Sequence, residues 1–211
     1  GQFTLALAIV MFIGLVSTIG LPQGILRFGT IEALQDGKAG AHKVTRSALR
    51  ITIPISLLLM AAVFLTAKSL STLIFHKEEL TPIIQLLAIS IPFMSLQSTL
   101  LAGTRALKVM RYSTIVWVVQ PLIALLLAIL FIYRGGGAES AALAYVISFV
   151  FGAGLALFFY LRLIPRQDRR TAHYSVKKML KFSIPLSLTE WMHFANERIE
   201  IFFLGLLPGT L

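Results

Sequence analysis

Long apolar stretches alternate with short polar ones along the whole chain. A helix that crosses the hydrocarbon core of a bilayer needs about 20 mostly apolar residues. The alternation of apolar and polar positions that marks a half-buried strand is absent from these stretches. The pattern therefore predicts an all-α, polytopic membrane protein with six transmembrane helices, over residues 3–21, 51–75, 83–103, 113–133, 140–164 and 182–207.

Proline and glycine interrupt several of the predicted helices. In a membrane bundle, neighbouring helices can satisfy the carbonyls that a proline leaves unpaired, so we expect kinked helices rather than helix ends. Gly20 and Gly24 lie on either side of Pro22 and predict a place where the first helix bends or unwinds. The prolines inside other predicted helices are Pro54, Pro92, Pro121 and Pro185.

The composition agrees with a membrane protein. Apolar residues make up 57% of the chain and charged residues only 13%, and the mean hydropathy is +0.84. In soluble domains, about a quarter of the residues are charged. The chain has no cysteine, which excludes disulfide scaffolds, thiolate nucleophiles and cysteine-ligated zinc.

Basic residues are distributed over alternate connections between the predicted helices. Lys and Arg number 19 against 9 Asp and Glu, and 15 of the basic residues lie in or beside the segments 27–50, 104–112 and 165–181. The other connections hold only Lys68, Lys77 and Arg134. By the positive-inside rule, the three basic segments are cytoplasmic and both ends of the chain lie on the opposite side. A nucleic-acid-binding protein would gather its charge on one face, so no nucleic-acid partner is expected.

The two ends of the chain predict an internal fragment of a longer membrane protein. The first apolar stretch begins directly after Gly1 and Gln2, without the basic leader and cleavage site of a secretory signal. The last residues, up to Leu211, follow directly on another apolar stretch.

The predicted helix over 182–207 is apolar at both ends and polar in the middle. On insertion scales, each charge costs about 2.5–3.5 kcal/mol at the bilayer centre, so three Glu and one Arg could cost about 10 kcal/mol together. This helix should therefore face a protein interior or a water-filled cavity rather than lipid. Its polar side chains are Glu190, His193, Asn196, Glu197, Arg198 and Glu200.

The spacing of these residues places most of them on one face. With a rotation of about 100° per residue, four titratable side chains fall within an arc of about 80°: Glu190, His193, Glu197 and Glu200. Asn196 extends the arc, whereas Arg198 lies on another face, from which it would reach a neighbouring helix or the membrane surface. The stripe could line a central cavity and serve proton or cation coupling or substrate contact. Alternatively, it is a structural network that holds the helix to its neighbours.

Further polar candidates lie in or near other predicted helices. Arg27 could hold a phosphate through two parallel hydrogen bonds, or could act as an interfacial anchor. Gln23, Gln97 and Gln120 could line the same cavity or hydrogen-bond between helices.

The chain carries no recognisable enzyme signature. GxSxG, HExxH, a P-loop and an Asp-rich motif for Mg²⁺ and pyrophosphate are all missing, and the only aspartates are Asp36 and Asp168. One histidine with scattered glutamates does not define the closed geometry of a zinc site. We therefore expect no enzymatic activity, no metal and no cofactor.

Two segments resemble a known family. FTLALAIVMFIGLVSTIGLPQGILRF, residues 3–28, resembles the second transmembrane helix of polysaccharide flippases, in which a Gly-Leu-Pro break precedes Arg-Phe at the inner face. LKFSIPLSLTEWMHFANERIEIFFLG, residues 180–205, resembles their seventh helix. These flippases belong to the multidrug/oligosaccharidyl-lipid/polysaccharide exporter superfamily, and the resemblance covers essentially the whole chain, as helices two to seven.

The resemblance implies a larger transporter with two six-helix lobes around a central cavity, which opens alternately to each side. Residues 1–164 would be five helices of the first lobe, 165–181 the basic cytoplasmic linker, and 182–211 the first helix of the second lobe. The implied substrate is a polyprenyl-pyrophosphate-linked oligosaccharide, moved from the cytoplasmic to the outer leaflet of the plasma membrane.

The acidic stripe leaves alternatives open, because carboxylates do not favour an anionic pyrophosphate. It favours coupling to H⁺ or Na⁺ through the glutamates, with Arg27 and Arg198 nearer the lipid headgroup. It also suits a cation-coupled multidrug exporter of the same superfamily. An integral-membrane enzyme acting on polyprenyl substrates and a purely structural membrane subunit are the alternatives of another class.

Overall fold

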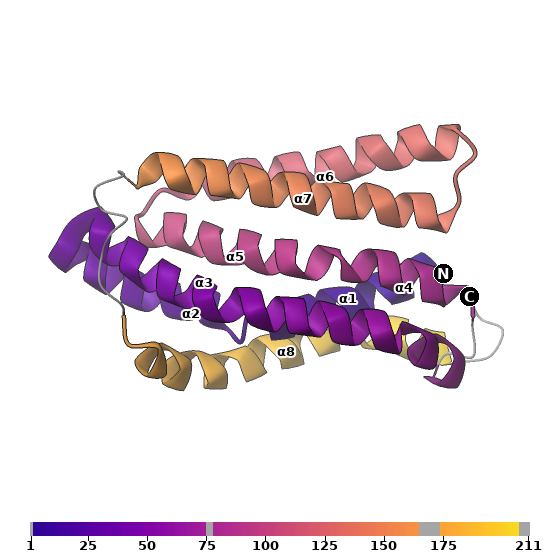
Figure 1. Cartoon of the computed structure of the whole chain (residues 1–211), viewed down its shortest axis with the longest axis horizontal. Coiled ribbons are helices and arrows are strands. Elements are labelled where there is room, and N and C mark those ends of the chain that lie inside the picture. Colours follow the sequence, from indigo (N-terminus) through magenta and orange to yellow (C-terminus); the bar gives the residue numbers. More distant parts are fainter. Residues whose placement is uncertain (1, 75–77, 165–173, 207–211) are drawn as a thin grey trace.

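The computed structural model describes residues 2–74, 78–164 and 174–206, and within these ranges the chain is helical with no strand (Figure 1). The predicted all-α class is confirmed. The elements are α1 (Gln2–Ser17), α2 (Leu21–Gly24), the π-helical turn η1 (Ile25–Gly29), α3 (Thr30–Ser69), a second π-helical turn η2 (Leu70–Ile74), α4 (Leu80–Ala88), α5 (Ser90–Ala106), α6 (Met110–Tyr133), α7 (Ala138–Leu163) and α8 (Val176–Leu206).

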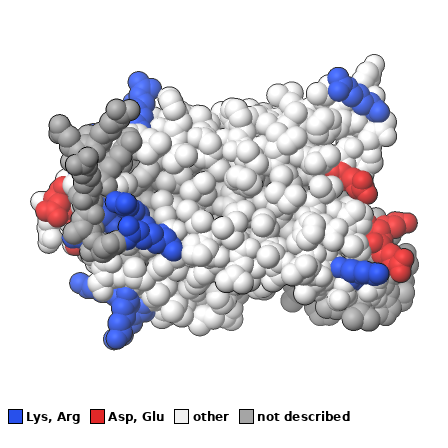
Figure 2. All heavy atoms as spheres, in the orientation of Figure 1, with Lys and Arg blue, Asp and Glu red and all other residues white. Residues whose placement is uncertain are grey.

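The lengths and compositions of the helices are those of a membrane protein. On the face shown in Figure 2, Lys, Arg, Asp and Glu side chains lie towards the two ends of the molecule, with an uncharged band between them. Two of the six predicted transmembrane helices are not both long and apolar enough to cross a bilayer. Helix α1 ends already at Ser17, and α8 has 31 residues but a polar middle. Four segments in the described residues are long and apolar enough to cross a bilayer: Leu21–Thr72, Leu80–Ala106, Met110–Tyr133 and Ala138–Leu163.

The segment 27–50, which the sequence predicted as a cytoplasmic loop, is helical instead. It runs from η1 into α3, and the chain bends sharply at Asp36 and Gly37, where Gly37 has φ 61° and ψ −140°. Beyond this bend α3 packs back against η1. Charges at Lys38 and Lys43 lowered the local hydropathy, but long basic side chains can reach the membrane surface from a helix end. The hydropathy pattern therefore placed the start of the second helix too late.

The other two basic segments, 104–112 and 165–181, are also helical in part. In place of a loop over 104–112, α5 runs to Ala106 and α6 starts at Met110. The last six residues of the predicted linker 165–181 are helical, because α8 already begins at Val176. The residues 165–173 of this linker lie outside the described part of the chain.

The chain leaves helical geometry between α1 and α2, as Gly20 and Pro22 predicted. Ile19 has φ 48° and Gly20 has φ 64°, and the left-handed region is uncommon for a β-branched residue such as Ile19. Pro22 then lies in the first turn of α2, where its missing N–H leaves no helical hydrogen bond broken. The break is therefore a specific turn built from these residues, whereas Gly24 keeps ordinary helical angles.

Replacing Gly20 by alanine should destabilise the protein more than the same change at Gly135. Both glycines have a positive φ, but a Cβ at Gly20 would lie 2.6 Å from the backbone oxygen of Ser183 in α8, and one at Gly135 would meet nothing within 4 Å. We expect losses of about 3 and about 1 kcal/mol in the free energy of unfolding, because only Gly20→Ala adds a clash to the backbone strain. Unfolding of the full-length protein in detergent measures both. Equal losses would show that the contact with α8 contributes nothing.

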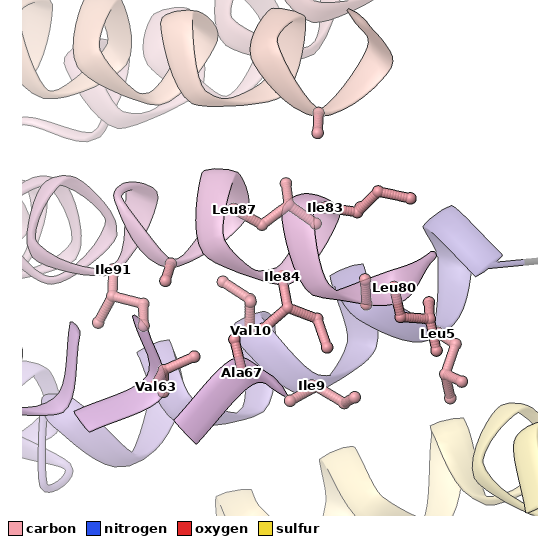
Figure 3. Packing of buried hydrophobic residues seen from close by; sticks show 13 residues of the cluster. Leu5, Ile9, Val10, Val63, Ala67, Leu80, Ile83, Ile84, Leu87 and Ile91 are labelled. Carbon is pink, nitrogen blue, oxygen red and sulfur yellow. The ribbon is translucent and has the colours of Figure 1, made fainter. Parts of the chain in front are cut away.

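The bundle packs around α5, which lies against α1, α3 and α7 (Figure 1). In lipid, helices associate through close packing and hydrogen bonds, since the surrounding tails are as apolar as the core. One end of the core joins α1, α3 and α4 through side chains such as Val10, Val63 and Ile84 (Figure 3). The small buried residues of α5, which permit close approach, are Ser90, Ser95, Thr99, Ala102, Gly103, Thr104 and Ala106.

Helices α6 and α8 lie on opposite sides of this bundle (Figure 1). The main contacts of α6 are with α7, and its other faces expose large apolar side chains, as expected of a helix against lipid. The main contacts of α8 are with α1 and α2. These contacts place the polar middle of α8 beside the break in the first helix.

Candidate functional site

A cavity of about 460 Å³ lies between α1, α2, α5 and α8. The break at residues 18–20 brings α2 to its wall, since the chain changes direction there. Apolar side chains from α1, α5 and α8 form part of the lining, among them Met11, Leu15, Met94 and Phe194. The polar lining consists of Thr18, Gln23, Ser98, Arg105, Glu190, His193 and Glu197.

The polar stripe of α8 faces this cavity through three side chains. Glu190, His193 and Glu197 all line it, as their shared arc on the helix indicates. His193 Nε2 lies 3.3 Å from Glu197 Oε1, and the two side chains are 73% and 58% exposed. Because so exposed a pair gains little from its mutual attraction, both side chains remain accessible to a ligand in the cavity.

A hydrogen bond links the stripe to the broken helix. The Gln23 side-chain nitrogen donates to Glu190 Oε1 at 2.8 Å, across 167 positions of sequence. The second carboxylate oxygen of Glu190 can still accept a proton, a hydrogen bond or a cation. The bond therefore joins α2 to α8 at the wall of the cavity without neutralising the charge there.

The remaining stripe residues do not line the cavity. Asn196 is exposed on α8 and is not part of the cavity wall. Arg198 is half-buried on another face, as predicted, and interacts electrostatically with Tyr145 of α7. Glu200 belongs to α8, but its side chain lies outside the described part of the structure. Within residues 2–74, 78–164 and 174–206, no three His, Asp or Glu side chains gather as metal ligands would.

Arg27 lies away from the cavity, at the end of the α2–α8 contact. It is exposed, and its guanidinium carbon is 4.4 Å from the ring centre of Phe182 and 5.7 Å from that of Phe28. Lys178 Nζ lies 5.9 Å from the Phe28 ring. The Arg27 guanidinium and the Lys178 ammonium therefore lie near aromatic faces, an arrangement that holds them in place while their N–H groups remain open to an anion.

Tyr174 anchors the chain just before α8 begins. Its backbone N–H donates to Ser47 Oγ at 3.1 Å, and its ring packs on Phe28 with 6.0 Å between centres. Burial, and then the Glu32 carboxylate, raise the pKa of the Tyr174 hydroxyl above its ordinary value, so this group is neutral at physiological pH. The start of α8 is thus attached to α3 and η1 through neutral contacts.

Of the two roles that the sequence allowed for Gln97 and Gln120, the structure shows the hydrogen bond between helices. Gln97 Nε2 donates to Gln120 Oε1 at 2.7 Å, which joins α5 to α6 away from the cavity. A hydrogen bond of this kind between membrane helices stabilises their packing.

Sequence reasoning did not single out Arg105 as a lining residue. It was counted among the basic residues of a cytoplasmic loop, but it belongs to the last turn of α5 and lines the cavity. Its guanidinium carbon lies 5.4 Å from the ring centre of Trp117 in α6. Its spacing in the sequence could have identified it. Met94, Ser98 and Arg105 follow one another at intervals of four and seven residues, which places all three on one face of a helix.

Almost the whole chain matches a known protein family. Residues 1–210 match a protein family described as polysaccharide biosynthesis protein. The chain belongs to this family. The resemblance that segments 3–28 and 180–205 carry is thereby confirmed. No curated protein and no solved structure is significantly similar to the chain.

The family and the fold together define the protein in broad terms. The chain belongs to a family of polysaccharide biosynthesis proteins, and its helices are those of a multi-pass membrane protein. The cavity between these helices carries polar and titratable side chains on part of its wall.

Proposed function

We propose that the protein moves a lipid-linked oligosaccharide across the plasma membrane by alternating access, and that this chain forms part of the pathway. Membership of the polysaccharide biosynthesis protein family supports a transporter of polysaccharide precursors rather than an enzyme. The observation that carries the proposal is the cavity between α1, α2, α5 and α8, with Glu190, His193 and Glu197 on its wall.

The contact between α8 and the rest of the bundle suits a transporter that opens and closes. Residues 1–164 and 182–211 belong to different lobes in this proposal, so the Gln23–Glu190 bond joins the lobes. A polar contact that separates is rehydrated by the water of the opening cavity, whereas a broken apolar contact would expose its surface to that water. The two lobes can therefore part at the cavity at a modest cost.

The positions of the charged side chains suggest separate binding places for the substrate and the coupling ion. Glu190 and Glu197 would exchange H⁺ or Na⁺, since carboxylates in a cavity at membrane depth respond strongly to either. Arg27 and Lys178, held on aromatic rings at the other end of the α2–α8 contact, would meet the pyrophosphate of an arriving lipid. Arg198 would interact with the headgroup only after a rearrangement, because it does not line the cavity in this structure.

The proposal is tested with the complete gene in a strain whose own polysaccharide flippase is deleted. Wild-type protein should restore surface glycan. Glu197→Gln at equal membrane level should restore about fivefold less, because the change removes one charge from the cavity wall. Glu139→Gln is the matched control, since Glu139 is an exposed glutamate in the first turn of α7, away from this cavity.

The outcomes separate the candidate functions. Full restoration by Glu197→Gln would keep transport of the glycan and assign Glu197 to packing. The two glutamates in the cavity also favour cationic substrates, which is the specific observation for a multidrug exporter. Correctly inserted wild-type protein that restores no glycan but expels a cationic dye would establish that alternative.

A further inference from the structure

A second cavity, of about 320 Å³, lies at the end of the bundle where the basic segments meet. Three parts of the chain form it: α3 on both sides of its bend, the turn between α5 and α6, and the end of α7. The first cavity shares none of its residues. Most of the lining is apolar, including Ala33, Leu34, Leu107, Val109 and Leu163.

Two lysines from different elements also line this cavity. Lys38 follows the bend in α3 directly, and Lys108 lies in the turn between α5 and α6 with φ 60°. Neither lysine is within ion-pair distance of a carboxylate in the described residues, whereas nearby Lys43 pairs with Glu32 at 3.5 Å. Both side chains are exposed at the cavity. Within the described residues, the two lysines therefore have no salt-bridge partner at the cavity.

Apolar side chains surround these charges on the outer surface. Leu34 lines the cavity and is 76% exposed, and Met110, which follows the lining residue Val109 in the sequence, is 63% exposed. A Cβ at Gly37 would meet nothing within 4 Å, so the bend leaves open space there. Exposed apolar groups next to lysines, at the end of a membrane helix, lie at the depth where acyl chains meet phosphate headgroups.

We propose that this cavity binds an anionic phospholipid of the cytoplasmic leaflet. Lys38 and Lys108 would hold its phosphate, and Leu34, Val109 and Leu163 would receive the upper part of an acyl chain. Charge complementarity selects this occupant, because two cationic side chains lie beside an apolar wall, which matches an anionic headgroup joined to acyl chains. A free phosphate would use the two lysines but leave the apolar wall exposed. The site is independent of the proposed transport, since it shares no residue with the first cavity.

The test is lipid binding by the full-length protein in detergent, followed by native mass spectrometry. Phosphatidylglycerol and phosphatidylcholine with the same acyl chains are titrated separately, and inorganic phosphate is added as a competitor. The variant Lys38→Gln/Lys108→Gln should bind phosphatidylglycerol about 25-fold more weakly than wild type, which is about fivefold for each lysine near an anionic headgroup. The control Lys177→Gln/Lys181→Gln removes two exposed charges from the start of α8 and should retain binding.

A second variant tests the apolar wall. Leu34→Glu places a carboxylate at the mouth of the cavity and should abolish the preference for phosphatidylglycerol while both lysines remain. Equal weakening by the two double variants would overturn the proposal, because general charge would then explain the binding. Displacement of the lipid by millimolar inorganic phosphate would overturn it in favour of a simple anion site, and so would equal affinity for the two lipids.

Discussion

Replacing Gly103 by valine should lower the free energy of unfolding of the protein by about 3 kcal/mol, because a well-packed position cannot accept added atoms. Gly103 lies in α5 where this helix touches both α3 and α7. A Cβ there would be 2.7 Å from Tyr160 Cε2 and 2.8 Å from Thr45 Oγ1. Tyr160 cannot move aside freely, since its hydroxyl is 2.9 Å from His42 Nδ1 and its side chain is buried.

The matched control for this change is Gly154→Val in α7. A Cβ at Gly154 would meet nothing within 4 Å, so valine there should alter the stability by less than about 0.5 kcal/mol. Thermal unfolding of both full-length variants in the same detergent measures the difference, and their amounts in the membrane give a second reading. A stable Gly103→Val protein would contradict the packing of α5 against α3 and α7 described here.

Glu190→Leu should reduce the restored surface glycan by about tenfold at equal membrane level, since a hydrogen bond to a charged group contributes about 1.5–3 kcal/mol. The change removes the acceptor for the Gln23 side chain, which lies 2.8 Å from Glu190 Oε1. It also removes a charge from the cavity wall. Complementation of a flippase-deleted strain by the full-length protein is the measurement.

Two companion variants separate the contributions of the bond and the charge. Glu190→Gln keeps an acceptor for Gln23 and loses only the charge, so activity near wild type would assign the role to the hydrogen bond. Activity as low as that of Glu190→Leu would assign it to the charge and hence to ion coupling. Thr189→Leu changes an exposed neighbour on α8 and should stay within about twofold of wild type. A fully active Glu190→Leu protein would contradict a role for this contact in transport.

The membrane class, the helical fold and the break in the first helix follow from the sequence alone. Apolar stretches of bilayer length can bury their backbone polar groups only as helices, so the class needs no tertiary information. The break at Gly20 and Pro22 is equally local, because a left-handed turn and a helix start depend on the residues that form them. The shared arc of Glu190, His193 and Glu197 is a consequence of helical rotation.

The ends of the helices were predicted less well, because hydropathy measures composition and not hydrogen bonding. The segment 27–50 was predicted as a loop because it is charged, yet its backbone is helical on both sides of Gly37. The same cause led to the prediction of Arg105 as a loop residue, although it belongs to α5.

The tertiary structure alone decided which polar groups meet. Gln23 and Glu190 are 167 positions apart, and Gln97 found its partner in Gln120 rather than in the cavity. Arg27 rests on Phe182, and Lys38 shares a cavity with Lys108. Helical periodicity determines the face on which a side chain lies, but it contains no information on which helix lies opposite. That choice depends on the packing of small residues along α5 and on the turn at Gly20, through which the chain brings α2 and α8 together.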